Sequence, residues 1–242
     1  MKRYVLWLNL VFFLPLSAQK IKKTDLLQLE KQVFRHSLQN FDTDAAKNAA
    51  YRIIALEGKQ SVYMDSLAYI YMNQNNFLSC LKVSNQILEQ KEKFPILKLK
   101  AISLENLNAP KEAIVVYEKI FQQEQTPSVA YKLALLQYQI KRTAEAFATL
   151  KSVENKEFPT DMNILFTGPK KDQQQQVPFK AAYYNLLAMI SYDLHNYDES
   201  IAYFNKALEI FPDFFAAKQN KQAIEVMKKK LENNKEPLKN NE

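Results

Sequence analysis

Three side chains in this sequence could carry metal or nucleophilic chemistry: His36, His195 and Cys80 are its only histidines and its only cysteine. A closed metal site needs about four clustered ligands, so two distant histidines and one thiol do not predict one. A catalytic thiol needs an exposed, electropositive setting beside a base, whereas a free cysteine usually packs as a small hydrophobe. We therefore expect no metal site, no cofactor and no enzymatic activity.

Two other kinds of active site find little support. Asp198, Glu199 and Glu112 fall where helices are expected to begin, and carboxylates there stabilise the positive end of a helix. No pair of acidic residues stands out as a general acid and base. Phosphate-binding loops are rich in glycine, and the chain has only 2 Gly.

Composition points to helices as the elements that position these residues. The chain has 242 residues, of which 47% are hydrophobic, so it can bury a substantial core. With 2 Gly and 9 Pro it lacks the turn glycines that a sheet protein of this size would need. The composition favours helices joined by short connections.

The first 19 residues have the layout of a secretory signal peptide. Lys2 and Arg3 precede an apolar run over residues 4–16, and small residues follow, so cleavage is expected after Ala18 or Gln19. The run is short for a membrane span, which needs about 20 apolar residues; an uncleaved anchor or a buried helix is the alternative. No cysteine stands directly after the run, where a lipid would be attached, so we expect an exported protein that is periplasmic or secreted and not a lipoprotein.

The charge of the chain bears on its partners. The formal net charge is +7, and part of it lies in the Lys- and Asn-rich stretch KKKLENNKEPLKNNE at residues 228–242, which ends in the tail at residues 233–242. We expect this tail to be disordered and solvated; a weak association with an anionic membrane surface is the alternative. A nucleic-acid partner is not expected, because no basic motif with stacking aromatics is present.

One stretch, residues 183–212, reads YYNLLAMISYDLHNYDESIAYFNKALEIFP. Apolar residues recur at helical spacing on both sides of His195, which predicts two helices joined by a short turn. Asn196 is expected to cap the second helix, with Glu199 completing a capping box. Pro212 is expected to end that helix.

Small residues recur along the chain in two series, which mark where paired helices cross most closely. The first series is Ala68, Ala101, Ala134 and Ala188, and the second is Cys80, Ala113, Ala146 and Ser200. Both series advance by 33, 33 and 54 residues. Two independent series with the same steps indicate a repeated pair of helices.

This pattern resembles the tetratricopeptide repeat family, a helix-turn-helix unit with a period of about 34 residues. The matching residues are Tyr184, Leu187, Ala188, Tyr197, Phe204, Ala207 and Pro212. The resemblance implies an all-α, right-handed α-solenoid of antiparallel helix pairs with a C-terminal capping helix, over residues 20–232. The expected helix pairs and the final cap span residues 25–57, 61–93, 94–126, 127–153, 181–212 and 213–232.

An insertion at residues 155–180 accounts for the long third step. It contains a glutamine run at Gln173–Gln176 and the sequence GPKKD, both of which look disordered. Its apolar stretch Met162–Phe166 is expected to dock on the helices. Two interpretations stay open: a spacer with a packed apolar anchor, or a segment that shapes a binding groove.

The resemblance implies that the first helix of each pair lines a concave groove that binds a protein or peptide. The candidate binding residues are Tyr69, Met72, Asn73, Lys98, Asn106, Tyr131, Tyr138, Asn185, Met189 and Tyr192. Tyrosine and methionine would supply apolar anchors, and asparagine would supply hydrogen bonds.

The resemblance also allows one ligand type to be set aside. Family members that clamp a terminal carboxylate use lysine and asparagine at fixed repeat positions, and only Lys98 fits. We therefore expect a less charged ligand in an aromatic-lined groove, held by a non-catalytic scaffold of the bacterial cell envelope. The alternative is a structural component of an envelope assembly that acts through its convex face, insertion or basic tail. The oligomeric state is left open.

Overall fold

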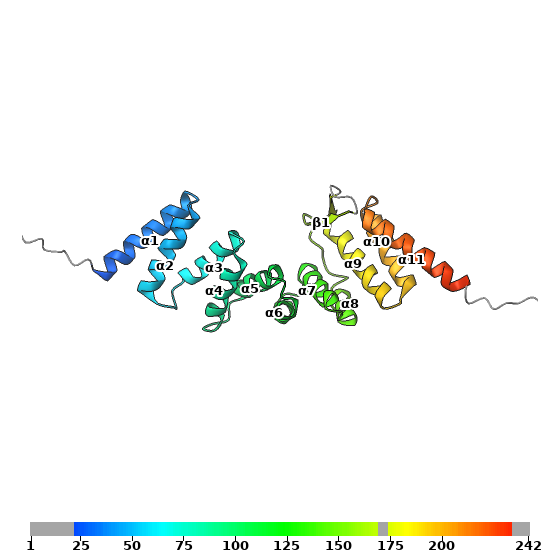
Figure 1. The fold of residues 1–242 in the computed structure, drawn as a ribbon, viewed down its shortest axis with the longest axis horizontal. Coiled ribbons are helices and arrows are strands. Elements are labelled where there is room, and N and C mark those ends of the chain that lie inside the picture. Colours follow the sequence, from blue (N-terminus) through cyan, green and yellow to red (C-terminus); the bar gives the residue numbers. More distant parts are fainter. Residues whose placement is uncertain (1–21, 169–173, 234–242) are drawn as a thin grey trace, which may run out of the picture. The chain divides into compact units, whose positions relative to one another are not determined.

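The structure is a computed structural model that describes residues 22–168 and 174–233. The predicted signal peptide, residues 169–173 of the insertion, and the predicted tail after Asn233 lie outside the described residues. The described residues form, in chain order, α1 (Lys23–Gln39), α2 (Thr43–Glu57), α3 (Tyr63–Asn73), α4 (Phe77–Leu88), α5 (Phe94–Asn106), α6 (Pro110–Gln123), α7 (Pro127–Gln139), α8 (Thr143–Lys151), β1 (Asn163–Thr167), β2 (Gln174–Pro178), α9 (Phe179–Asp193), α10 (Tyr197–Ile210) and α11 (Phe215–Asn233) (Figure 1).

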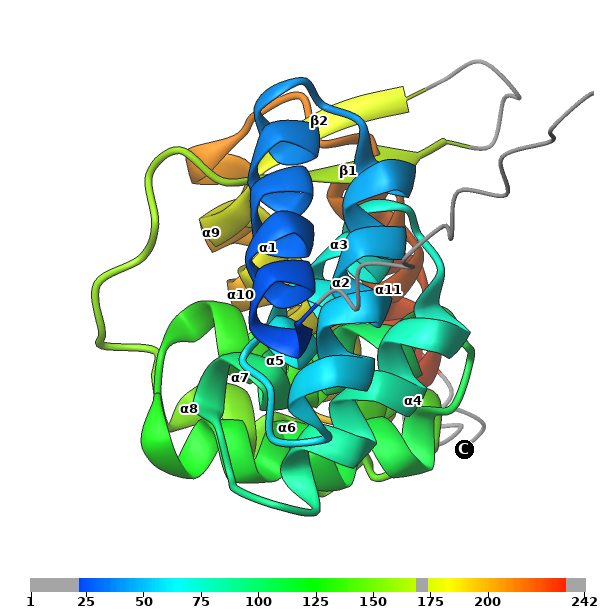
Figure 2. The same ribbon diagram turned by 90° about the vertical axis from the view of Figure 1, so that its left-hand side faces the viewer.

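The chain divides into two compact units between residues 63 and 64. In the first unit, α1 and α2 lie side by side as an antiparallel pair (Figure 2). Ala46 and Ala50 are fully buried on α2. An ion pair at 2.5 Å between Lys31 and Glu57 links the two helices.

In the second unit, helices that are consecutive in the chain pack on one another from α4 to α11. Every member of the two small-residue series is fully buried: Ala68, Cys80, Ala101, Ala113, Ala134, Ala146, Ala188 and Ser200. At one crossing the Ser200 hydroxyl donates a hydrogen bond of 2.7 Å to the Ala188 carbonyl. The repeated helix pairs of the predicted solenoid are thus confirmed, while its right-handed twist stays a prediction.

Each helix pair turns on one residue in the left-handed backbone region. These residues are Phe41, Asn75, Asn108, Lys141 and His195, with φ between 55° and 65°. After each of them a backbone N–H returns to the helix that has just ended, as Asn196 N–H does to the Ser191 carbonyl at 2.9 Å. This is the Schellman arrangement that ends many helices, built here without glycine.

The predicted capping box of α10 is wrong. Asn196 occupies the N-cap position, but its side chain makes no capping hydrogen bond. The Glu199 carboxylate instead accepts a hydrogen bond of 3.2 Å from the Tyr203 hydroxyl one turn later. Side-chain caps do occur earlier in the chain, where Asp42 and Asn76 each accept a backbone N–H at the start of α2 and α4.

The insertion forms a hairpin that the sequence did not predict. Strands β1 and β2 pair antiparallel, with Ile164 opposite Val177 and Phe166 opposite Gln175 (Figure 2). The expected disorder of the glutamine run is therefore wrong for Gln174–Gln176, which lie in β2.

Side chains of the hairpin fix it to the loop before α11. The ring of Phe166 meets that of Phe214 edge-on, with centroids 4.7 Å apart. The Gln175 amide donates to the Asp213 carbonyl at 2.6 Å and accepts from the Phe215 N–H at 3.3 Å. The glutamine thus supplies a partner for a backbone N–H at the start of α11, which such N–H groups otherwise lack. The apolar part of the insertion docks on the helices, as expected.

Helix α11 covers the last repeat with an apolar stripe. The stripe consists of Phe214, directly before α11, and Ala217 and Ile224 on α11, and all three are buried. The last helix pair therefore does not end on an exposed apolar face. Within the part of the chain that the structure describes, we find no helix of the length and apolarity that a bilayer crossing requires.

Candidate functional site

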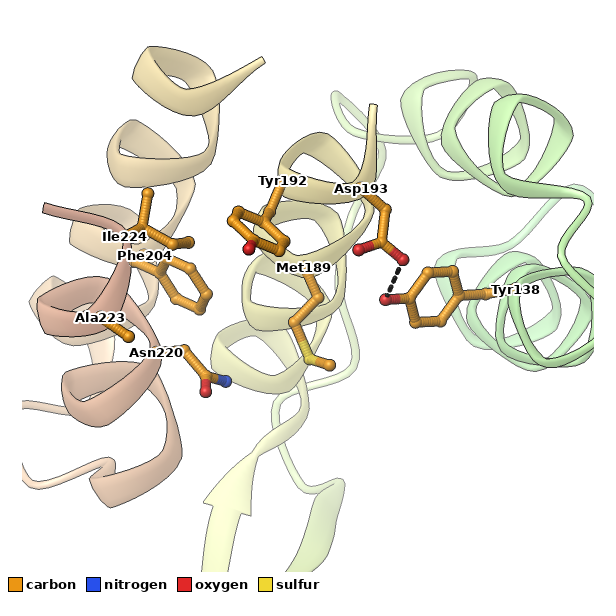
Figure 3. Close-up of a pocket in the computed structure, with 8 residues that line it drawn as sticks. All are labelled: Tyr138, Met189, Tyr192, Asp193, Phe204, Asn220, Ala223 and Ile224. Atoms are coloured by element: carbon orange, nitrogen blue, oxygen red, sulfur yellow. Dashed lines mark hydrogen bonds between the residues drawn. The ribbon is translucent and has the colours of Figure 1, made fainter. Parts of the chain in front are cut away.

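A recess lies between the first helices of the last two pairs and helix α11; we call it the C-terminal pocket. It has a volume of about 280 Å³. Its lining residues are Tyr138, Met189, Tyr192, Asp193, Phe204, Asn220, Ala223 and Ile224. Figure 3 shows Met189 and Tyr192 on α9 between Tyr138 of α7 and the side chains of α11.

One hydrogen bond ties the two repeats together at the edge of this pocket. The Tyr138 hydroxyl donates to Asp193 Oδ2 at 2.8 Å (Figure 3). Burial raises the pKa of Tyr138, and the Asp193 carboxylate raises it further, because both disfavour the phenolate. The tyrosine therefore keeps its proton and holds the carboxylate in place.

Tyr192 forms the wall between α9 and α11. Its hydroxyl lies 3.5 Å from the Met227 sulfur on α11, and its ring lies 5.8 Å from that of Tyr197. Met189 is half-buried beside it. A rigid tyrosine ring next to a flexible thioether suits a surface that receives apolar side chains of varied shape.

A second recess, the central pocket, lies along α5, α6 and α7 and has a volume of about 420 Å³. It is lined by Lys98, Ile102, Glu105, Asn106, Tyr117, Ile120, Glu124, Ser128, Val129, Lys132 and Met162. Met162 comes from the insertion, and the Ser128 hydroxyl lies 3.8 Å from its sulfur. Of the two interpretations of the insertion, this contact favours the one in which it shapes the groove.

The charges of the central pocket are paired internally. Lys98 Nζ lies 2.6 Å from Glu124, and Lys132 Nζ lies 2.6 Å from Glu105. The Tyr117 hydroxyl also donates to Glu105, at 2.9 Å. Lys98, the residue that fits a carboxylate clamp, is thus already paired with Glu124.

The structure brings five of the ten candidate binding residues into these two pockets. Tyr138, Met189 and Tyr192 line the C-terminal pocket, and Lys98 and Asn106 line the central one. Tyr69, Met72 and Asn73 lie on α3, which contributes to neither pocket. Tyr69 is 44% exposed.

The remaining two candidates are buried, contrary to expectation. Tyr131 is 6% exposed because its ring packs edge-on against Phe179, 5.3 Å away, at the end of the insertion; burial raises its pKa to about 12. Asn185 is 3% exposed, and its amide faces the Met189 sulfur at 3.7 Å. Neither side chain is presented to a ligand.

Sequence reasoning missed the part of the C-terminal pocket that lies on the capping helix. Asn220, Ala223 and Ile224 were not candidates, because residues 213–232 were expected only to form a capping helix. Their position on the helix could have identified Asn220 and Ala223. Both lie within about one turn of Ile224, a residue of the apolar stripe of α11, so they face α9 together with it. Phe204 was likewise expected only as core.

The cysteine and the two histidines, which could carry nucleophilic or metal chemistry, line neither of the two pockets. Cys80 is fully buried, with its sulfur 4.0 Å from the Ser84 hydroxyl. His195 is an exposed turn residue beside Tyr197, and His36 is exposed on α1. Among residues 22–168 and 174–233, no group of three His, Cys, Asp or Glu side chains could hold a metal ion. The pockets therefore offer shape, aromatic surface and hydrogen bonds.

Repeated helix pairs with small residues at each crossing and a covering final helix define a tetratricopeptide-repeat solenoid. Residues 181–214 match the family model described as "Tetratricopeptide repeat". Residues 181–214 thus carry one tetratricopeptide repeat, and the fold of the described residues is that of tetratricopeptide-repeat structures. No curated protein has a sequence that matches it.

Solved structures share this fold at low sequence identity. YrrB, described as a TPR protein with an unusual peptide-binding site, is 11% identical with a TM-score of 0.63, over 83% of this chain and 92% of YrrB. MamA protein is 14% identical with a TM-score of 0.58, over 77% of this chain and 92% of MamA. MamA from residue 41 to its end, from Desulfovibrio magneticus RS-1, is 13% identical with a TM-score of 0.57, over 79% and 98%.

Proposed function

We propose that the protein is a non-catalytic scaffold that holds a peptide or protein segment along its first-helix surface, from α5 to α9. Stacked helical repeats present extended surfaces of this kind to their partners. The tyrosines and methionines of the two pockets are residue types that anchor protein partners. YrrB, which has the same fold, has a peptide-binding site, and this supports a peptide as the class of ligand.

One observation carries the proposal: three side chains from two repeats converge with the capping helix in the C-terminal pocket. Tyr138 and Tyr192 each lie four residues after a small crossing residue, Ala134 or Ala188, on successive first helices. Together with Met189 they line one recess of about 280 Å³. A recess with two tyrosines and a methionine, open at the surface, suits a large apolar side chain of a bound segment. The paired charges of the central pocket suit an adjoining, uncharged part of the same segment.

The test selects ligands from a random peptide library displayed on phage and measures the dissociation constant of the best one by fluorescence anisotropy. Tyr138→Ala combined with Tyr192→Ala should raise this constant by about tenfold or more, because anchor residues carry most of the binding energy. Val115→Ala, which trims an exposed apolar side chain on the second helix α6, should leave it unchanged. Circular dichroism checks that all variants stay helical.

Two results would overturn the groove as the binding site. One is an unchanged dissociation constant in the folded double variant. The other is an equal loss in Val115→Ala, which would assign binding to the whole apolar surface.

We also propose that the protein is exported, to the periplasm or the medium, after removal of residues 1–19. The charged start, short apolar run and small residues at positions 17 and 18 support this location. An envelope-assembly role through the basic tail stays a prediction, since the tail after Asn233 lies outside the described residues.

A further inference from the structure

Asp193 gives the C-terminal pocket an unpaired negative charge, whereas the charges of the central pocket are paired with one another. It is the one lining residue of the C-terminal pocket with a formal charge. Its side chain is exposed at the pocket edge, and Figure 3 shows its carboxylate turned toward Tyr138. The hydrogen bond from Tyr138 occupies Oδ2 and leaves Oδ1 available to a ligand.

No cation of the described residues neutralises this carboxylate within 4.0 Å, although ion pairs are common elsewhere in the chain. In the central pocket both glutamates are paired with lysines at 2.6 Å. The Lys141 ammonium lies over the Tyr138 ring, 5.9 Å from its centroid, and forms no ion pair with Asp193 among the described residues. The C-terminal pocket therefore combines apolar walls with an unneutralised negative charge.

We propose that the C-terminal pocket recognises a protein segment in which a lysine or arginine adjoins a large apolar residue. The inference rests on the proposed function and names the ligand of that same groove. The apolar side chain would enter between Met189 and Ile224, and the basic side chain would pair with Asp193. Long basic side chains can lay their apolar stems along such a wall while the charged end stays in water.

Aromatic rings beside the carboxylate fit the same ligand. Cations are attracted to the faces of tyrosine rings, and arginine stacks on them readily. Tyr138 and Tyr192 stand on either side of the Asp193 end of the pocket (Figure 3). A glutamate or aspartate at the same place in the ligand would instead be repelled, so the pocket discriminates by charge as well as by shape.

The test repeats the random-library selection with the full-length protein and with Asp193→Asn. The amide oxygen of asparagine can still accept the Tyr138 hydrogen bond, so this variant removes the charge and keeps the geometry. The wild type should enrich peptides with lysine or arginine next to a large apolar residue, and Asp193→Asn should lose that enrichment. Asp213→Asn, an equal loss of charge on the loop before α11, should keep it.

Affinity measurements on the best wild-type peptide give the magnitude. Replacing its basic residue with glutamine should weaken binding to the wild type about three- to tenfold, because an exposed ion pair contributes modestly, and should change binding to Asp193→Asn by less than twofold. The preference should shrink between 50 and 500 mM salt as charges are screened.

The outcomes separate the two proposals. Binders without a basic residue, or the same enrichment in Asp193→Asn, overturn the charge preference and leave the groove standing if the tyrosine double variant still loses binding. A wild type that enriches no peptide overturns both.

Discussion

At the scale of single residues, Glu154 shows how one carboxylate can join two repeats. It follows α8 and lies between Lys151, with Nζ at 2.5 Å, and Lys206 of α10, with Nζ at 3.0 Å. Lys206 also lies over the rings of Tyr184 and Tyr203, 5.1 and 5.2 Å from their centroids. Burial alone would raise the pKa of Glu154, but the two lysine hydrogen bonds outweigh it and hold that pKa below its usual value.

This lowered pKa predicts a dependence of stability on pH. A carboxylate with a lowered pKa in the folded state stabilises above its unfolded pKa, about 4.3 for glutamate, and loses that contribution as pH falls through the folded value. Glu154→Gln should therefore lower the free energy of unfolding at pH 7 by about 1–2 kcal/mol, and the difference from wild type should shrink below about pH 4.

Urea unfolding at several pH values measures this effect. Glu145→Gln is the matched control, because Glu145 pairs with Arg142 at the surface; an exposed pair is screened by solvent, so its loss should change stability much less than Glu154→Gln does. A Glu154 variant that is no less stable than wild type at pH 7 would contradict the proposed role of this carboxylate.

The side chains that line a groove can be located from repeat spacing only where nothing else packs on them. Tyr138 and Tyr192 each lie four residues after a small crossing residue, Ala134 or Ala188, and both line the C-terminal pocket. Tyr131 also lies on a first helix, α7, but its ring packs against Phe179, a residue of the insertion. Since the insertion breaks the repeat, a pattern derived from the repeat could not predict that contact.

At the scale of elements, the turns within the helix pairs carry measurable backbone strain. A left-handed conformation costs a non-glycine residue about 1–2 kcal/mol, and asparagine tolerates it better than a bulky residue does. Phe41 has φ 58° and is 90% exposed. Its ring makes little packing contact that could offset the strain.

Phe41→Gly should therefore stabilise the protein by about 0.5–1 kcal/mol, the relief of strain less the extra chain entropy that glycine brings to the unfolded state. Phe41→Ala should have almost no effect, because alanine keeps the Cβ that causes the strain. Asn108→Gly should also be nearly neutral. Thermal unfolding followed by circular dichroism compares the three, and equal effects of glycine and alanine at position 41 would refute the strain argument.

The elements that follow the repeat could be predicted, and the one that departs from it could not. Two series of small residues placed the helix crossings of the second unit, because each crossing needs a small side chain at a fixed interval. The hairpin had no such signal: Gln174–Gln176 form a strand because β1 pairs with them and because Gln175 bonds the backbone on both sides of Phe214. Of these partners, Asp213 and Phe215 lie 38 and 40 residues from Gln175 in the sequence.

At the scale of the whole molecule, export is the proposal that rests on sequence alone, and it has a direct test. Expression with a cleavable signal should yield a mature chain whose first residue is Gln19 or Lys20. Intact-mass measurement of the protein from the periplasm or medium, with N-terminal sequencing, should find one of these two ends. A full-length chain recovered from the membrane fraction would show instead that the apolar run is an uncleaved anchor.

The buried thiol at one helix crossing has a practical consequence. Cys80 has no exposed surface in the native protein and is the only cysteine in the chain, so an alkylating reagent reaches it only when that crossing opens. The rate of alkylation under native conditions therefore reports the opening of a single repeat within an intact solenoid, without any introduced label.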